Sequence, residues 1–223
     1  MLIEIPGILD TSQLAAVQSV LDQCQFTDGK LSAGVNALKK KDNEEIDANE
    51  DRLDALNSVV MTQLVQHPVY LNSALPAKIS LPIYARYTRG MSYGRHIDDP
   101  VMGGASSRYR SDISITIFLN NPGDYDGGEL CIETPFGDNQ IKLPAGHAVL
   151  YPSSSRHEIK PVTRGERLVA IAWVQSMVRS AEQRQILFQL SQAREQLKSQ
   201  SESSAYLQID DSYTNLVRMW AEV

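Results

Sequence analysis

The sequence has few cysteines, no long apolar run and no strongly basic segment. Its two cysteines, Cys24 and Cys131, show no CxxC spacing, which argues against a disulfide scaffold or a thiolate metal site. No apolar stretch reaches the length of a membrane span, and the first residues lack the basic and apolar regions of a secretion signal. Lys and Arg total 21 against 27 Asp and Glu, and the net charge of −6 disfavours nucleic acid as a partner. These absences predict a cytoplasmic protein that binds neither nucleic acid nor membranes.

Two amphipathic helices are expected in residues 1–77, together with an N-terminal strand, all packing on a barrel. The first helix covers residues 13–25, because apolar side chains recur there at helical spacing behind capping residues at 10–12. The second helix must end before Pro68, since the residue before a proline avoids the helical region. Its apolar stripe consists of Leu53, Leu56, Val60 and Leu64.

Residues 78–177 have the sequence pattern of a β domain. Short runs rich in Ile, Val, Tyr and Thr alternate with turns that contain Gly, Pro, Asn or Asp, and no helix-length pattern separates them. The sheets should therefore be antiparallel and the fold class mainly β with flanking helices, as in a double-stranded β-helix or jelly roll. The expected strands cover residues 79–88, 112–119, 129–133, 140–143, 147–151, 156–162 and 167–174.

Helical patterning returns in residues 178–223, which predict a C-terminal helical appendage. An amphipathic stripe over residues 186–197 is followed by a polar break and a short helix over 213–220. The stripe could serve a homodimer as readily as it packs on its own barrel, so the oligomeric state stays open at this point.

Two histidines and a carboxylate carry the predicted chemistry. His96 and Asp98 are two residues apart, so in an extended strand both side chains project to the same face. His157, on a later strand, can supply a third ligand. Two His and one carboxylate on one face of an octahedron leave three positions open for oxygen and a chelating cosubstrate, the arrangement of non-haem iron(II) oxygenases. The sequence thus predicts an iron(II) oxygenase with these three residues as metal ligands and catalytic residues.

Arg167 adds an anchor for a diacid beside the predicted metal. Residues 156–162 and 167–174 have the pattern of a hairpin, in which Gly165 suits the left-handed position of a three-residue loop. On that register His157 faces Ile171, and His157 and Arg167 project from one face of the sheet. The guanidinium could then form paired hydrogen bonds to the distal carboxylate of a five-carbon keto diacid that chelates iron through its other end.

Six segments between residues 86 and 167 combine into one family pattern, which extends over nearly the whole chain through Phe26-Thr27-Asp28-Gly29 and Ser32-Ala33-Gly34 near the start and the helical C-terminal tail. The six segments are Arg86-Tyr87-Thr88-Arg89-Gly90-Met91, His96-Ile97-Asp98, Asp112-Ile113-Ser114, Asp124-Tyr125-Asp126-Gly127-Gly128-Glu129-Leu130, Ser155-Arg156-His157-Glu158 and Val162-Thr163-Arg164-Gly165-Glu166-Arg167. The combination resembles the bacterial PKHD-type hydroxylases, which are prolyl-hydroxylase-like members of the Fe(II)/2-oxoglutarate dioxygenase superfamily. The resemblance implies a double-stranded β-helix, iron(II) on His96, Asp98 and His157, and the distal carboxylate of 2-oxoglutarate on Arg167.

The same resemblance implies a reaction and its partners. Hydroxylation is expected rather than halogenation, because related halogenases replace the carboxylate ligand with a small residue and Asp98 is present here. Molecular oxygen and 2-oxoglutarate are the implied cosubstrates, and L-ascorbate (vitamin C) is the accessory reductant usual among prolyl-hydroxylase-like enzymes. The family is often associated with bacterial iron uptake, which implies a link to that process. The resemblance does not identify the substrate, which could be a peptidyl residue or a small molecule.

Three further features near the predicted site each have two interpretations. Tyr87 could donate a hydrogen bond to 2-oxoglutarate or substrate, although an aromatic residue in a strand more often packs in a core. Residues 99–107 could form a lid over the substrate or a plain connection. Residues 39–45 could form a recognition patch, but their mixed charge and lack of an apolar stripe favour a solvated loop.

Two other classes of protein are compatible with the same residues. A non-catalytic iron or oxygen sensor would keep the metal site and act by binding a partner through the terminal helices. A cupin-like metalloprotein of other activity would have no use for Arg167.

Overall fold

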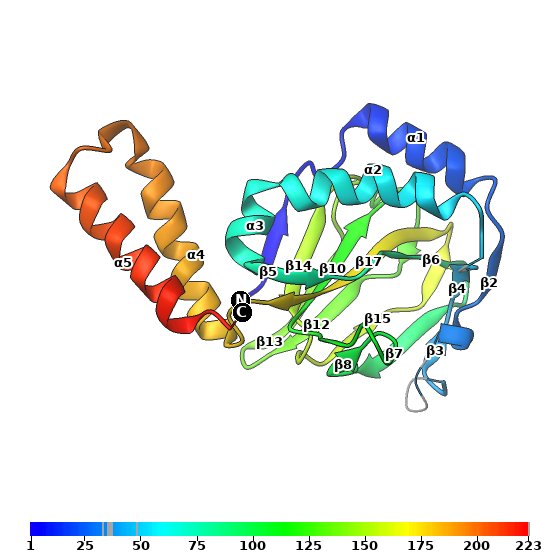
Figure 1. Ribbon diagram of the computed structural model, residues 1–223. Coiled ribbons are helices and arrows are strands. Elements are labelled where there is room, and N and C mark those ends of the chain that lie inside the picture. Colours follow the sequence, from blue (N-terminus) through cyan, green and yellow to red (C-terminus); the bar gives the residue numbers. More distant parts are fainter. Residues whose placement is uncertain (33, 35–37, 48, 223) are drawn as a thin grey trace.

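Two antiparallel sheets face each other in the computed structural model, which describes residues 1–32, 34, 38–47 and 49–222 (Figure 1). Helices from the N-terminal third lie over the outer face of the larger sheet, and a helical hairpin at the C-terminus extends away from the barrel. The predicted fold class, mainly β with antiparallel sheets and flanking helices, is confirmed.

The larger sheet contains the two longest strands of the protein, and both are mainly apolar. In spatial order its strands are β1 (Ile3–Ile5), β14 (Ala148–Pro152), β10 (Ile113–Phe118), β17 (Arg167–Ser176), β6 (Ile83–Tyr87), β4 (Glu44–Ile46) and β2 (Phe26–Asp28), and β5 (Pro76–Ile79) also pairs with β17. Strands from residues 1–77 therefore pair with strands of the predicted β domain. The expected continuous strand over 79–88 is divided into β5 and β6.

The smaller sheet closes the other side of the barrel. Its strands are β13 (Gly137–Ile141), β12 (Leu130–Thr134), β15 (His157–Ile159), β7 (Ser92–His96) and β3 (Lys41–Asp42). Two short ribbons complete the β structure: β11 (Asp126–Gly127) pairs with β16 (Val162–Arg164), and β8 (Val101–Met102) pairs with β9 (Tyr109–Arg110). The expected strand over 156–162 is thus interrupted, with β15 and β16 in different sheets.

Side chains of the larger sheet alternate between two cores because successive residues of a strand point to opposite faces. The isoleucines of β10 pack under the helices, whereas Phe118 packs between the sheets. In β17, Val169 also packs between the sheets. By the same alternation Arg167 and Trp173 face the space between the sheets, where both line a pocket.

Helix α1 (Thr11–Leu21) begins at a capping box. The Asp10 carboxylate accepts a hydrogen bond from the Gln13 amide at 2.8 Å, and the Gln13 side chain accepts one from the Asp10 amide at 2.9 Å. The predicted cap is therefore confirmed at Asp10. The predicted end at residue 25 is wrong, because the chain leaves the helix after Leu21 and turns into β2.

Helix α2 (Leu53–Gln66) lies across the larger sheet, and its predicted stripe and its end before Pro68 are confirmed. A third helix, α3 (Pro68–Ala74), was not predicted. Pro68 occupies its first turn, where no amide donor is needed, and the His67 ring accepts a hydrogen bond from the Val69 amide at 3.3 Å. Proline therefore begins a new helix here as well as ending the one before it.

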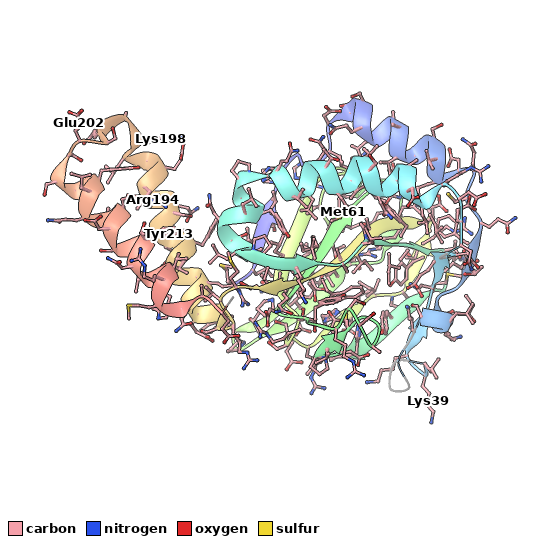
Figure 2. The ribbon with its side chains drawn as sticks, viewed as in Figure 1. Lys39, Met61, Arg194, Lys198, Glu202 and Tyr213 are labelled. Carbon is pink, nitrogen blue, oxygen red and sulfur yellow. The ribbon has the colours of Figure 1, made fainter. Side chains whose placement is uncertain are left out.

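The C-terminal appendage is a hairpin of α4 (Ala181–Gln196) and α5 (Ser204–Trp220), joined by a short 3-10 turn, η2 (Lys198–Gln200) (Figures 1 and 2). Arg194 joins the two helices, because its guanidinium pairs with Asp210 at 2.5 Å and lies 4.4 Å from the centre of the Tyr213 ring. The short helix predicted over 213–220 is longer and begins at Ser204. Among the described residues, no helix combines the length and apolarity needed to cross a membrane.

The solvated loop expected over residues 39–45 is a wrong prediction. Residues 41–42 form β3 in the smaller sheet and residues 44–46 form β4 in the larger sheet, so this segment crosses from one sheet to the other. Lys41 and Glu45 are both 7 % exposed and form an ion pair. The prediction failed because it assumed that these charged residues stay in solvent. Lys41 and Glu45 form an ion pair with each other, so both can be buried.

Both cysteines are free thiols. Cys131 is buried in β12, whereas Cys24 is only half-buried beyond the end of α1.

Candidate active site

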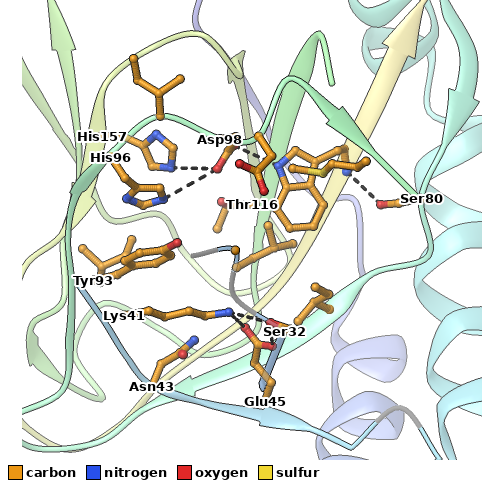
Figure 3. Close-up of a pocket in the computed structure, with 18 of the residues that line it drawn as sticks. Ser32, Lys41, Asn43, Glu45, Ser80, Tyr93, His96, Asp98, Thr116 and His157 are labelled. Atoms are coloured by element: carbon orange, nitrogen blue, oxygen red, sulfur yellow. Dashed lines mark hydrogen bonds and ion pairs between the residues drawn. The ribbon is translucent and has the colours of Figure 1, made fainter. Parts of the chain in front are cut away.

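A pocket of about 1090 Å³ lies between the two sheets and contains all five predicted site residues in its wall (Figure 3). They come from four strands of the two sheets, β6, β7, β15 and β17, and from the chain just after β7. The five residues are Tyr87, His96, Asp98, His157 and Arg167.

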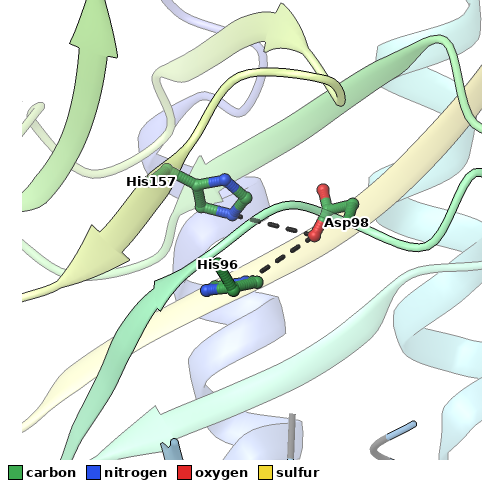
Figure 4. A group of neighbouring side chains, drawn as sticks. All are labelled: His96, Asp98 and His157. Carbon is green, nitrogen blue, oxygen red and sulfur yellow. Dashed lines mark ion pairs between the residues drawn. The ribbon is translucent and has the colours of Figure 1, made fainter. Parts of the chain in front are cut away.

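His96, Asp98 and His157 meet at one point of the pocket wall (Figure 4). His96 ends β7 and lies opposite His157 in the register of the antiparallel β7–β15 pair. The Nε2 atom of each histidine lies 3.7 Å from Oδ1 of Asp98, and one ligand atom from each of the three residues falls within 4.8 Å of the others. Three donors this close can touch a common ion.

The two imidazoles are oriented by backbone carbonyls. Nδ1 of His96 lies 2.9 Å from the Gly94 carbonyl, and Nδ1 of His157 lies 3.0 Å from the Ser155 carbonyl. A protonated Nδ1 donates to each carbonyl, which leaves Nε2 as the electron-pair donor toward the pocket. Burial, and then the nearby His157, lower the pKa of His96 to about 4, so this ring is neutral at physiological pH.

Asp98 is held so that only one of its oxygens faces the histidines. The indole Nε1 of Trp173 donates to Oδ2 at 2.9 Å, and the Ser114 hydroxyl donates to the same oxygen. Ser114 is itself hydrogen-bonded to Ser153 at 2.7 Å. The Oδ1 atom is therefore directed at the two imidazoles, and the three side chains match the two-histidine, one-carboxylate donor set typical of iron(II).

Arg167 reaches the pocket by a different route from the one predicted. The predicted hairpin is wrong: β15 pairs with β12 and β7, whereas β17 pairs with β10, β6 and β5. His157 and Arg167 therefore belong to opposite sheets. They still converge, because both line the same pocket from facing walls.

The Arg167 guanidinium is fully buried and forms no hydrogen bond with any residue that the structure describes. Its charge lies 5.2 Å from the centre of the Tyr87 ring and 5.5 Å from that of Phe118. A buried cation without an acceptor is costly, and a carboxylate that enters the pocket would supply the paired acceptors that a guanidinium prefers. This unpaired group fits the distal end of a bound dicarboxylate such as 2-oxoglutarate.

Tyr125 is a second unpaired group beside Arg167. Its hydroxyl is buried without a hydrogen-bond partner among the described residues, although Arg167 is close enough to oppose the rise that burial causes in the pKa of Tyr125. Gly128 leaves the room for this arrangement: a methyl group there would lie 3.2 Å from Cδ of Arg167 and 3.1 Å from Tyr125, and its φ of +67° suits glycine.

Both interpretations of Tyr87 find support. The side chain is 1 % exposed and belongs to the core between the sheets, yet it also lines the pocket opposite Arg167 in the β6–β17 register. Burial raises the pKa of Tyr87 to about 12, with Arg167 opposing the rise. The hydroxyl therefore stays protonated and can donate a hydrogen bond.

Several residues of the pocket wall, and of the group that holds Asp98 behind it, were not predicted from the sequence. Trp173 and Ser114, which hold Asp98, lie on strands that were predicted only as strands. Ser32, Lys41, Asn43 and Glu45 form a polar group on the opposite side of the pocket (Figure 3). Every second residue of this segment faces the pocket, namely Lys41, Asn43 and Glu45. This strand-like alternation was not recognised in the sequence because most of the residues involved are charged.

Two family profiles match adjoining parts of the chain. Residues 82–175 match the 2OG-Fe(II) oxygenase superfamily, and residues 182–222 match the PKHD-type hydroxylase C-terminal domain. The second match corresponds to the α4–α5 hairpin.

Curated relatives match the chain over its full length. A PKHD-type hydroxylase from Thioalkalivibrio sulfidiphilus is 49 % identical and one from a Polaromonas species is 42 % identical, and each alignment covers 100 % of both chains.

Solved structures share the fold at low sequence identity. A Pseudomonas putida prolyl-4-hydroxylase is 19 % identical with a TM-score of 0.54, covering 78 % of this chain and 92 % of that one. A Trichoplax adhaerens prolyl hydroxylase in complex with a hypoxia inducible factor peptide fragment is 21 % identical with a TM-score of 0.57, covering 78 % and 83 %. The chain therefore belongs to the PKHD-type hydroxylases, a group of 2-oxoglutarate-dependent dioxygenases whose superfamily uses iron(II) and 2-oxoglutarate.

Proposed function

We propose that His96, Asp98 and His157 bind iron(II), that Arg167 and Tyr87 bind the distal carboxylate of 2-oxoglutarate, and that the enzyme hydroxylates a substrate in the pocket between the sheets. The observation that carries the proposal is the presence of two features in one pocket: three clustered ligand atoms and a buried guanidinium without an acceptor among the described residues.

When bound, iron(II) and 2-oxoglutarate supply the oxidation of a substrate C–H bond by molecular oxygen. The chain's own residues contribute binding and orientation. The histidines present their Nε2 atoms, and Asp98 presents one oxygen because Trp173 and Ser114 donate hydrogen bonds to the other. Arg167 lies in the sheet opposite the histidines. Three side-chain ligands leave coordination positions for the reactants.

Hydroxylation is favoured over halogenation because Asp98 supplies a carboxylate at the position where a halogenase needs space for halide. The substrate class stays open at the level of the fold. Similar structures include a prolyl hydroxylase with a peptide fragment and HygX with hygromycin B, at 21 % and 13 % identity. Use of L-ascorbate, a role in iron uptake, a cytoplasmic location and homodimer formation through α4 and α5 are further proposals that rest on the family resemblance and the predicted amphipathic stripe.

Turnover of 2-oxoglutarate without substrate tests the proposed function. Protein loaded anaerobically with iron(II) and 2-oxoglutarate is expected to release succinate slowly when oxygen is added. Protein that binds both iron(II) and 2-oxoglutarate but releases no succinate would instead support the non-catalytic sensor. A cupin-like metalloprotein would bind the metal and not 2-oxoglutarate.

Trp173→Phe is expected to weaken iron(II) binding while the fold is retained. The substitution removes the indole donor to Asp98 and keeps the aromatic bulk. Loss of a group that orients a metal ligand costs about 10- to 100-fold in metal affinity. Anaerobic iron(II) titration measures the effect, and Trp220→Phe in α5 is the matched control. Equal affinities in the two variants would remove Trp173 from the metal site.

Tyr125→Phe is expected to weaken 2-oxoglutarate binding about 3- to 10-fold, the effect of losing one hydrogen bond. The Tyr125 hydroxyl lies beside Arg167, where the distal carboxylate is proposed to bind. Tyr70→Phe is the matched control, because that hydroxyl is also buried without a partner among the described residues but packs under the helices. Calorimetric titration of the iron-loaded protein with 2-oxoglutarate compares them, and an equal loss in both variants contradicts the assignment.

A further inference from the structure

The segment that crosses between the sheets forms the wall of the pocket opposite the metal site (Figure 3). Because β3 pairs with β7 and β4 pairs with β6, alternation along this segment turns three side chains to one face. Lys41, Asn43 and Glu45 all line the pocket, whereas Asp42 is exposed and Glu44 pairs outside with Arg86.

Lys41 and Glu45 neutralise each other. The Lys41 ammonium lies 2.5 Å from one oxygen of Glu45, and the Ser32 hydroxyl donates to the other at 2.6 Å. Lys41 also donates to Ser32 at 2.8 Å, which closes a three-membered network. This part of the wall therefore carries no net charge and does not favour either a cationic or an anionic substrate group.

Asn43 is the member of the wall without internal partners. Its side chain is 3 % exposed, and neither Nδ2 nor Oδ1 forms a hydrogen bond with any described residue. The amide end is turned toward the pocket in Figure 3. Gly29 leaves room for the Asn43 amide, because a methyl group on residue 29 would lie 2.0 Å from Oδ1 of Asn43. A buried amide with a free donor and a free acceptor is complementary to another amide.

Part of the pocket rim is aliphatic, beside the exposed and charged lining residues Lys40, Asp99 and Arg156. Leu31, Leu81, Ile97 and Val101 line the pocket and are between 51 % and 82 % exposed. Exposed aliphatic side chains gathered around one opening mark a binding surface for an apolar group.

We propose that Asn43, with the neutral Lys41–Glu45–Ser32 network beside it, forms a subsite that binds an uncharged amide group of the primary substrate, while the aliphatic rim holds an apolar part of the same molecule. The inference rests on the proposed function and names the chemistry of its substrate. The amide could belong to a peptide or to a small amide-bearing metabolite, and both present the same group to Asn43.

Three probes that share the isovaleryl group test the subsite: isovaleramide, methyl isovalerate and isovalerate. They are titrated into protein loaded anaerobically with iron(II) and 2-oxoglutarate, and binding is followed by ligand-observed NMR. The amide is expected to bind about 3- to 10-fold more tightly than the ester and the acid, which is the effect of about one hydrogen bond. Equal binding of the three probes by the wild-type protein overturns the proposal.

Asn43→Leu is expected to abolish this preference, because it keeps the size of the side chain and removes the amide. Gly29→Ala is a second variant that retains Asn43 and displaces its amide by steric contact, so it should lose the preference as well. The matched control is Asn139→Leu on the exposed face of β13. Isovaleramide binding that is unchanged in both subsite variants contradicts the inference.

Titration of the same proteins with 2-oxoglutarate distinguishes a failure of the amide subsite from a failure of the proposed function. The Asn43 amide lies near the Tyr87 hydroxyl, so a role toward the cosubstrate is the competing explanation. Asn43→Leu that weakens 2-oxoglutarate binding and leaves isovaleramide unaffected establishes that competing role and overturns the subsite. A wild-type protein that does not bind 2-oxoglutarate overturns the proposed function instead.

A capped peptide, acetyl-Ala-Leu-Ala-amide, distinguishes the two sources of the amide. If the substrate is a peptide, this probe should bind more tightly than isovaleramide. The Leu31→Ser substitution at the rim should then remove the difference in affinity between the two probes. A small substrate predicts no gain over isovaleramide. Either result supports the amide subsite, provided that Asn43→Leu weakens both probes.

Discussion

His157→Ala is expected to abolish iron(II) binding and with it the formation of succinate from 2-oxoglutarate. His157 supplies one of three ligand atoms, and its Nε2 lies 3.7 Å from the Asp98 oxygen that faces the same point. Because loss of a residue that merely orients a ligand costs about 10- to 100-fold in metal affinity, loss of a ligand should exceed about 100-fold. Anaerobic titration with iron(II) measures the affinity, and succinate is quantified after oxygen is added.

His147→Ala is the matched control for this prediction. His147 is half-buried in the turn before β14 and is absent from the pocket wall, so iron affinity and succinate formation should stay at wild-type values. His96→Ala should behave like His157→Ala, since the two rings face each other across the β7–β15 pair. Wild-type iron affinity in either ligand variant would refute the proposed site.

The cluster of proposed metal ligands is the part of the molecule that the sequence predicts best, because part of its signal is local. The two-residue spacing of His96 and Asp98 brings both side chains to one region in any extended chain. The pairing of His96 with His157 is not local. It depends on which strand lies beside β7, and strand order in a jelly roll is decided by the packing of whole sheets rather than by the residues next to the histidine.

The wrong hairpin illustrates the same limit. A glycine turn between two strand-like segments favours pairing of those segments, and Gly165 does adopt the left-handed conformation with φ of +67°. The chain nevertheless passes from the smaller sheet through β16 into the larger sheet, so β15 and β17 face each other instead of pairing. His157 and Arg167 converge across the barrel, so both line one pocket although the predicted pairing of their strands was wrong.

The buried charges of the crossing segment could not be predicted from composition. Charged residues are rarely buried without partners, so a run with Lys41 and Glu45 favours solvent exposure. The two residues are four positions apart, and the alternation of an extended chain places both on the face that closes the pocket. Only the pairing of β3 and β4 with different sheets reveals that this face is internal.

Arg167→Met is expected to weaken 2-oxoglutarate binding strongly without impairing iron(II) binding. Removal of one partner of a buried, hydrogen-bonded charge pair costs about 2–5 kcal/mol, which corresponds to a loss of roughly 30-fold to more than 1,000-fold in affinity. Arg167→Lys keeps the charge and loses the paired geometry, so its affinity should be intermediate. Calorimetric titrations with 2-oxoglutarate and with iron(II) separate the two effects.

The stability of the same variant gives an independent test. In the protein without cosubstrate, Arg167 is a buried cation with no acceptor among the described residues, and an apolar side chain of similar length removes that cost. The Tm of Arg167→Met without 2-oxoglutarate is therefore expected to equal or exceed that of the wild type, while the rise in Tm that 2-oxoglutarate gives the wild type should disappear.

Arg184→Met is the matched control, because Arg184 is also buried but donates to the carbonyls of Val178 and Arg179 at 2.8 Å. Its substitution should lower the Tm and leave 2-oxoglutarate affinity unchanged, the reverse of the Arg167 result. An Arg167→Met protein with a lowered Tm and normal 2-oxoglutarate affinity would show that this guanidinium serves the fold and not the cosubstrate. The two buried arginines thus separate a charge retained for a ligand from one retained for structure.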